Sequence, residues 1–152
     1  MATDLRFECT HFDALGVHAL YALLLLRSRV FVVEQQCVFL DADGLDPVAH
    51  HLLGWARDRE LACAARIFAP GVVYDEPSIG RVVSAPEHRG TGAGRRLMER
   101  AIAECVRMYG DTGIRIGAQR YLEAFYASLG FVIASEPYDE DGIPHVTMLR
   151  PG

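Results

Sequence analysis

The chain has 152 residues, 51% of them hydrophobic and 23% charged, and this composition excludes a disordered protein. The net charge of −5 argues against nucleic-acid binding through bulk charge, and no apolar run approaches the roughly 20 residues of a membrane-spanning helix. The four cysteines are scattered singly, without the spacing of a zinc or thioredoxin-type site. We therefore expect one cytoplasmic domain spanning residues 1–152, with no metal and with neither nucleic acid nor membrane as a partner.

Short elements of alternating type are predicted in the first half of the chain. A strand over Leu5–Cys9 precedes apolar residues at helical spacing over Leu15–Val32, and β-branched residues there predict that the helix ends near Phe31. The stretch "FLDADGLDP" has the Asp, Gly and Pro content of a loop. Two strands, His51–Ala56 and Leu61–Phe68, flank "RDRE" and predict a hairpin.

The second half begins with a predicted strand over Ile79–Ser84, which leads into a long amphipathic helix over Gly92–Tyr109. The elements predicted after it are a strand at Ile114–Ala118, a short helix at Tyr121–Leu129, and a last hairpin of Phe131–Ala134 and His145–Leu149 around "YDEDGIP". The strand–helix–strand unit should be parallel, whereas the earlier hairpin is antiparallel. This order predicts an α/β fold with a mixed sheet that has helices on its faces.

The stretch "RGTGAGRRLM" joins the predicted strand to the long helix and places Gly90, Gly92 and Gly94 at alternate positions. Glycine permits positive φ and close approach of a ligand, and a helix N-terminus attracts negative charge, so the stretch predicts an anion site. A P-loop would need Lys and then Ser or Thr after its last glycine, but Arg95 and Arg96 follow Gly94. A dinucleotide fingerprint fails as well, because its G-x-G-x-x-G spacing and its place after the first strand are both missing.

The pattern that fits is Arg-x-x-Gly-x-Gly, formed by Arg89, Gly92 and Gly94, with Pro86 three residues before the arginine. At this point the sequence resembles the GNAT superfamily of N-acetyltransferases. The blocks "RSRVFVVEQ", "IGRVVS", "GAQ", "FYASLGF" and "EDGIPHVTM" are similar to its ElaA-type branch and extend the resemblance over roughly Tyr21–Met148. The resemblance implies a GNAT-type, mostly antiparallel mixed sheet flanked by helices in a single domain.

The resemblance also implies acetyl-CoA as the acyl donor, held in two parts. Backbone amides of the glycine turn would wrap the pyrophosphate, while the preceding strand would pair with the pantetheine arm in a gap before the next strand. A backbone N–H near Val83 would stabilise the oxyanion. The implied cofactor-binding residues are Val82, Val83, Ser84, Arg89, Gly90, Thr91, Gly92, Ala93, Gly94 and Arg95.

Acetyl transfer to an amine also needs an acid for the thiolate and a base for the amine. By resemblance, Tyr126 in "YASLGF" is the expected acid near the thioester sulfur. The base stays open between Glu34, which follows the first predicted helix, and His145, which lies on the last hairpin. A third candidate, His51, alternates with an apolar residue on a strand, and this placement favours a structural histidine over a base.

The acceptor is expected to be an amine on a small molecule or a peptide. The acidic run Tyr138–Gly142, together with Asp41, Asp43 and Asp46 in the earlier loop, is a candidate for attracting a cationic acceptor. The alternative function is an acyl-CoA-binding regulatory module that keeps the cofactor site but is catalytically silent. A homodimer is compatible with the superfamily, although no interface can be identified in the sequence.

Overall fold

The computed structural model describes residues 4–152 apart from the side chain of Asp58, so residues 1–3 of the expected domain lie outside the described part. One eight-stranded sheet has the strand order β1-β2-β3-β4-β5-β8-β6, with β7 also paired to β8. Its strands are β1 (Arg6–His11), β2 (His50–Trp55), β3 (Leu61–Phe68), β4 (Ser78–Ser84), β5 (Ile114–Gln119), β6 (Val132–Ile133), β7 (Tyr138–Glu140) and β8 (Ile143–Arg150). Within this range β4 and β5 pair in parallel and the other pairs are antiparallel, which confirms the predicted single mixed sheet.

Three α-helices accompany the sheet: α1 (Val17–Arg27), α2 (Ala93–Tyr109) and α3 (Glu123–Ala127). The prediction that the first helix ends near Phe31 was wrong, because α1 continues as a π-helical segment, Ser28–Glu34. Wider π-helical turns are rare and occur often at functional sites. Short 3₁₀ turns occupy Phe12–Ala14, Asp46–Val48, Arg57–Arg59, Pro86–His88 and Arg120–Leu122. None of the helices within residues 4–152 is long and apolar enough to cross a membrane.

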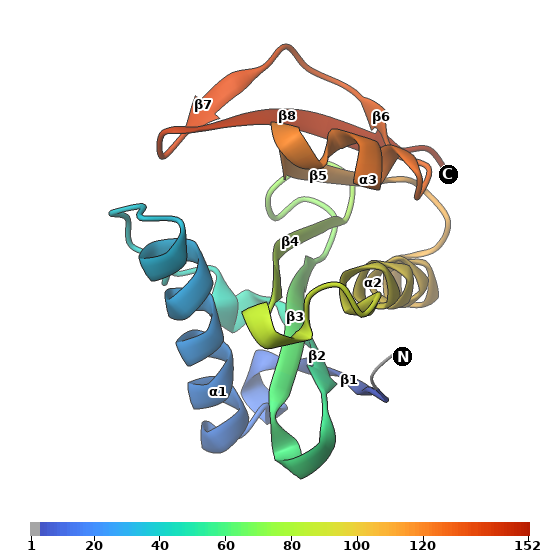
Figure 1. Cartoon of the computed structure of the whole chain (residues 1–152). Helices are drawn as coiled ribbons and strands as arrows, with labels where there is room; N and C mark the ends of the chain where they lie inside the picture. Colours follow the sequence, from blue (N-terminus) through green and yellow to red (C-terminus); the bar gives the residue numbers. More distant parts are fainter. Residues whose placement is uncertain (1–3) are drawn as a thin grey trace.

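The core has two parts because the central strands are covered on both faces. Helices α1 and α2 lie on opposite sides of β2–β4 (Figure 1). On β2, Leu52 packs in the cluster that contains Leu97 and Met98 of α2, and the next residue, Leu53, packs in the cluster that contains Leu23 of α1. Successive strand residues point to opposite faces, so both leucines are fully buried. All eight residues of β3 are buried for the same reason.

The C-terminal hairpin differs from its predicted form. The whole stretch "YDEDGIP" was predicted as the turn, but Tyr138–Glu140 forms β7 and pairs with the start of β8. The turn is confined to Asp141 and Gly142, which both have positive φ, at 53° and 82°. An Asp-Gly pair is typical of this two-residue hairpin turn. Because the turn is shorter than predicted, the acidic residues Asp139 and Glu140 lie on a strand that pairs with the start of β8.

Candidate functional site

The site begins where β4 and β5 separate. Within the described chain these strands pair at one position, Ser78 with Arg115, and the amide of Arg115 donates to the carbonyl of Pro77 at 3.0 Å. Beyond this point the strands diverge (Figure 1), and a cleft of about 560 Å³, the main cleft, lies between them. The edge of β4 from Ile79 to Ser84 therefore borders a cleft instead of another strand.

A β-bulge interrupts β4 along this edge. Ala64 of β3 pairs with Val83 and Arg66 pairs with Gly80, so two residues of β4 oppose one residue of β3. One of the two, Arg81, has a φ of 46°, in the left-handed region that residues other than glycine seldom adopt. A bulge leaves its extra residue outside the ladder and re-aims nearby groups, which is why bulges are common beside active sites.

The glycine-rich turn has the backbone that its composition predicted. Gly90 and Gly92 have φ values of 76° and 82°, and Gly92 is the N-cap of α2. Gly94 differs, because its φ is ordinary and a Cβ atom there would lie 3.6 Å from Ser84 Oγ. Two of the three glycines are therefore required by the turn, whereas the third lies beside the end of β4 at a position where a Cβ atom would make only an ordinary contact.

Arg89 and Glu34 join the two sides of the main cleft. The guanidinium of Arg89 donates to both carboxylate oxygens of Glu34, at 2.6 and 2.8 Å. These hydrogen bonds lower the pKa of Glu34 below its ordinary value. The pair thus connects a candidate base to a candidate phosphate ligand and keeps the carboxylate ionised.

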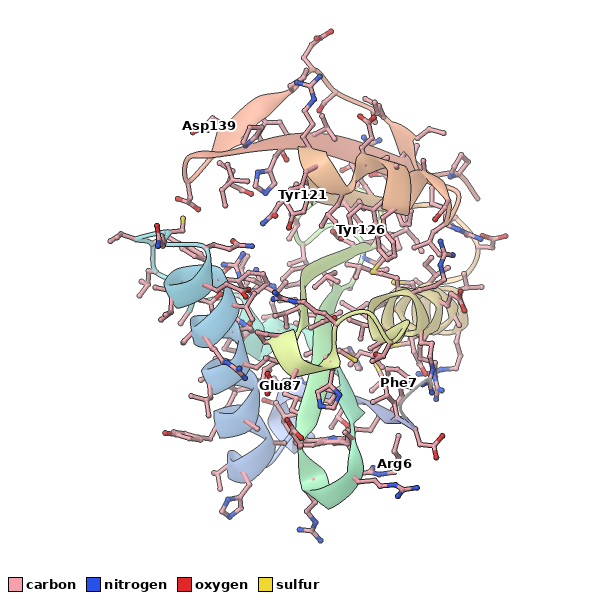
Figure 2. The ribbon with its side chains drawn as sticks, viewed as in Figure 1. Arg6, Phe7, Glu87, Tyr121, Tyr126 and Asp139 are labelled. Atoms are coloured by element: carbon pink, nitrogen blue, oxygen red, sulfur yellow. The ribbon has the colours of Figure 1, made fainter. Side chains whose placement is uncertain are left out.

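Tyr126 reaches the main cleft from α3, and Figure 2 shows it with Tyr121 beneath that helix. Its side chain is 6% exposed and makes edge contacts with the rings of Phe125 and Phe131, at centroid distances of 5.2 and 6.0 Å. Burial, with a smaller contribution from Tyr121, raises the pKa of Tyr126 to about 12. The phenol is therefore protonated at neutral pH and can donate a hydrogen bond into the cleft.

The two candidate histidines occupy different environments. His145 lines the main cleft; its Nδ1 lies 2.7 Å from the carbonyl of Ile143, and its Nε2 lies 3.2 Å from Glu140 Oε2. His51 is fully buried outside the main cleft, with Nε2 3.0 Å from the carbonyl of Asp46. Burial lowers the pKa of His51. The structure thus favours the structural interpretation of His51 and leaves Glu34 and His145 as candidate bases.

The main cleft brings together the expected catalytic residues and part of the expected cofactor site. The expected residues in its lining are Glu34, Tyr126, His145, Val82, Val83, Ser84, Arg89 and Gly94. The other expected residues, Gly90, Thr91, Gly92, Ala93 and Arg95, lie in the adjoining turn and the first turn of α2. The side chain of Arg95 turns toward α3, where its guanidinium contacts Ser128 Oγ and lies over the ring of Phe125.

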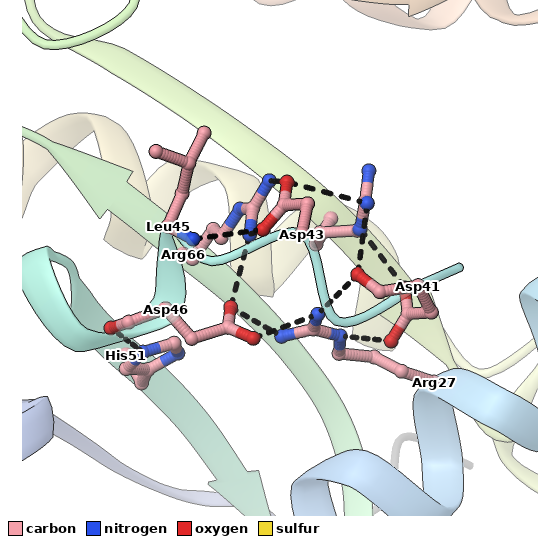
Figure 3. A network of polar contacts seen from close by, with 8 residues as sticks. Arg27, Asp41, Asp43, Leu45, Asp46, His51 and Arg66 are labelled. Atoms are coloured by element: carbon pink, nitrogen blue, oxygen red, sulfur yellow. Dashed lines mark hydrogen bonds and ion pairs between the residues drawn. The ribbon is translucent and has the colours of Figure 1, made fainter.

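The prediction that Asp41, Asp43 and Asp46 attract a cationic acceptor was wrong. Arg27 lies 2.9 Å from an oxygen of Asp41 and 2.7 Å from one of Asp46, and Arg66 bonds both Asp43 and Asp46 (Figure 3). Hydrogen bonds from Arg66 hold the pKa of Asp43 well below its usual range. Three arginines and three aspartates form this network, which we call the Arg–Asp network: Arg27, Arg66, Arg81, Asp41, Asp43 and Asp46. Its charges balance, so it presents no net negative charge to an acceptor.

Comparison with known proteins agrees with this geometry. Residues 49–150 match the model of the acetyltransferase (GNAT) domain. The chain belongs to the GNAT acetyltransferase family. Protein ElaA of Escherichia coli is 41% identical over 148 residues, covering 96% of each chain, and a UPF0039 protein of Synechocystis is 40% identical over 146 residues, covering 96% of this chain and 95% of that protein. The resemblance to the ElaA-type branch is confirmed, and family membership supports acyl transfer as the class of reaction.

Solved GNAT structures have the same architecture. An acyl-CoA N-acyltransferase from Pseudomonas aeruginosa aligns with a TM-score of 0.92 and 45% identity, covering 97% of this chain and 99% of that one. The crystal structure of Escherichia coli ElaA aligns with a TM-score of 0.90 and 40% identity over the same shares. These neighbours confirm the predicted fold, a mostly antiparallel mixed sheet flanked by helices.

Sequence reasoning missed two features of this GNAT site. Arg81 was not singled out, and nothing in its local sequence predicts a positive φ or a bulge. Glu140 was included only in an acidic run, although the Asp141–Gly142 turn signal would have placed it on a strand that pairs with β8. That pairing is what brings Glu140 beside His145.

Proposed function

We propose that the protein transfers an acetyl group from acetyl-CoA to an amine acceptor by direct attack in a ternary complex. The observation that carries this proposal is one cleft bordered by the unpaired edge of β4, by the glycine turn at the start of α2 and by Tyr126. An acetyltransferase of Bacillus subtilis solved in complex with CoA has a similar fold, with a TM-score of 0.66 and 22% identity. That similarity supports the same kind of donor here.

The proposed donor site has two parts. Backbone N–H groups from Arg89 to Arg95 face the pyrophosphate, helped by the partial positive charge at the N-terminus of the 17-residue helix α2. The pantetheine arm, whose amides resemble peptide groups, pairs with Val82, Val83 and Ser84 as a short extra strand. The open edge of β4 supports this pairing, because its hydrogen-bonding groups face the main cleft.

The proposed chemistry needs a polarised carbonyl, a free amine and a protonated leaving group. A backbone N–H near Val83 stabilises the oxyanion, and Glu34 or His145 accepts the proton of the ammonium. Tyr126 donates its hydrogen bond to the departing thiolate. With a pKa of about 12, the phenol is a weaker acid than an ordinary thiol of pKa about 8.5, so it assists by stabilising the developing thiolate until a proton is transferred.

The test is thiol release from acetyl-CoA, with and without a panel of amines, for wild type and Tyr126→Phe. We expect release that depends on the amine, and a loss in kcat of about 100-fold in the variant, because only the hydroxyl is removed. CoA affinity should be equal in the two proteins. Binding of CoA without amine-dependent thiol release would instead support the catalytically silent binding module, and equal turnover would refute the role of Tyr126.

A further inference from the structure

A second cleft adjoins the main cleft, and its lining differs in character. It has a volume of about 470 Å³ and is bordered by the loop before β2, the β3–β4 loop and β4 itself. Three aromatic side chains, Phe39, Phe68 and Tyr74, contribute to it. The two clefts meet at residues that line both, among them Arg81, Gly117, Glu140 and Asp141.

The charges at this junction do not balance. The cations Arg66 and Arg81 belong to the neutral Arg–Asp network, and Arg89 is paired with Glu34. Among the described residues that line the two clefts, Glu140 and Asp141 are the carboxylates without an arginine partner. The junction is therefore a negatively charged point between aromatic walls, and such a point attracts a cation.

Glu140 and His145 lie close enough together for one cation to donate hydrogen bonds to both side chains. A carbonyl oxygen only accepts hydrogen bonds, so the 2.7 Å contact with Ile143 means that Nδ1 of His145 carries a proton. Nε2, on the other side of the ring, lies 3.2 Å from Glu140 Oε2. The carboxylate only accepts hydrogen bonds, so the hydrogen in this contact comes either from the ring itself or from a bound cation that donates to both groups. The ring is 8% exposed and stacks on Tyr138 at 5.9 Å, so it cannot easily turn away.

We propose that the acceptor is a cationic amine without a carboxylate beside its ammonium, and that it binds where the two clefts meet. This inference rests on the proposed acetyl transfer. The ammonium donates to Glu140 and to Nε2 of His145, while the apolar part of the acceptor lies against the aromatic residues of the second cleft. A carboxylate next to the ammonium, as in a free α-amino acid, is repelled by Glu140 and Asp141.

This arrangement assigns the proton transfers of the reaction. One proton of the ammonium passes to Nε2 of His145, which becomes an imidazolium stabilised by Glu140. The free amine nitrogen then forms a bond with the thioester carbonyl carbon, and the carbon–sulfur bond breaks with its electron pair on sulfur. The amide nitrogen loses its second proton, the thiolate gains one, and the imidazolium finally releases its proton to water.

The test is calorimetric titration of the CoA-saturated protein with three matched probes: 2-phenylethylamine, 2-phenylethanol and phenylalanine. We expect the cationic amine to bind at least about tenfold more tightly than the neutral alcohol and the zwitterion, because a hydrogen-bonded charge is worth that much or more. Glu140→Gln should remove about the same factor for the amine alone. The matched control is Glu136→Gln, since Glu136 is exposed outside both clefts and loses the same charge. CoA affinity should be the same in all three proteins.

Equal binding of the three probes, no binding of the amine at millimolar concentration, or an unchanged affinity in Glu140→Gln would overturn this acceptor site. Thiol release measured in parallel separates it from the proposed function. If thiol release depends on the amine but Glu140→Gln binds the amine as tightly as wild type, acetyl transfer would be supported and the acceptor would bind elsewhere. Tight, Glu140-dependent binding without thiol release would support the cation site and refute the reaction.

Discussion

Glu34 and Arg89 form a two-point ion pair that joins the π-helical segment to the turn before α2. A second two-point pair, Arg29 with Glu87 at 2.7 and 2.9 Å, connects the same two segments. These side chains are partly exposed, so the pairs contribute little to stability. The Glu34–Arg89 pair matters for donor binding, because it neutralises the Arg89 guanidinium beside the turn whose backbone is proposed to hold the pyrophosphate.

Removing that carboxylate should strengthen donor binding. In Glu34→Gln the guanidinium of Arg89 keeps its position near a hydrogen-bonding side chain but loses the competing charge, so CoA should bind about threefold more tightly. Calorimetry at low and high salt measures this, and the gain should shrink at high salt. The matched control is Glu87→Gln, which breaks the neighbouring pair outside the cleft and should leave CoA affinity unchanged. Weaker binding by Glu34→Gln would contradict this role of the pair.

Alkaline pH should destabilise the fold through its buried thiols. Burial raises the pKa of Cys63 and of Cys105 from 9.0 to about 12. The unfolded thiols ionise from about pH 9 while the folded ones keep their protons, so the free energy of unfolding falls with rising pH between these values, by up to roughly 4 kcal/mol per thiol. Urea unfolding from pH 8 to 10.5 should show this slope, and Cys105→Ala should reduce it. An equal slope in both proteins would show that Cys105 does not cause it.

The Arg–Asp network should behave as one cooperative unit. Arg27 is fully buried, so Arg27→Met removes the partner that Asp41 and Asp46 share and leaves the network with an excess of one negative charge, at a cost of about 3–5 kcal/mol. Adding Asp46→Asn restores the balance of charges in the network, and the double variant should lose less stability than the sum of the two single variants. Denaturant unfolding of the four proteins measures the difference. Strict additivity would mean that the two side chains contribute independently.

Gly117 lines both clefts, and a side chain at this position should narrow the junction where the acceptor is proposed to bind. A Cβ atom there would lie 3.1 Å from Tyr138 Oη and 3.4 Å from Tyr74 Oη, closer than ordinary contact for the first. We expect Gly117→Ala to lower kcat/KM for the amine about tenfold while CoA affinity is unchanged, since small displacements in a site are costly. Adding Tyr138→Phe removes the nearer oxygen and should restore most of the activity. No loss in Gly117→Ala, or no recovery in the double variant, would contradict a steric role.

Features that one residue type alone can satisfy were predictable from the sequence. The turn before α2 needs positive φ at Gly90 and Gly92, and glycine is the residue that adopts it without strain. The buried strand β3 and the amphipathic helix α2 could also be predicted from the sequence. The spacing of apolar residues shows that both faces of the strand and one face of the helix pack against other elements. The family resemblance then placed Tyr126 and His145 near one cleft, where the structure brings them together.

Features that depend on distant partners were not predictable. Arg27 is buried on α1 together with Leu23 and Leu26. Its positive charge is balanced by Asp41 and Asp46, 14 and 19 residues later in the chain, and the periodicity of the helix gives no information about such distant partners. The aspartates of that loop were assigned to attracting a cationic acceptor for the same reason. The side chain of Arg81 likewise pairs with Asp41, about 40 positions earlier, and the local sequence gives no sign of this partner.

The most direct test of the account is calorimetric titration with CoA of wild type, Gly94→Ala and Gly94→Glu. Gly94 has an ordinary φ and room for a Cβ atom, so both variants should fold, as thermal unfolding would verify. We predict that wild type and Gly94→Ala bind CoA with similar affinity and that Gly94→Glu does not, because its carboxylate projects to where the pyrophosphate is proposed to lie. Equal binding by both variants, or no binding by wild type at millimolar CoA, would contradict the proposed donor site.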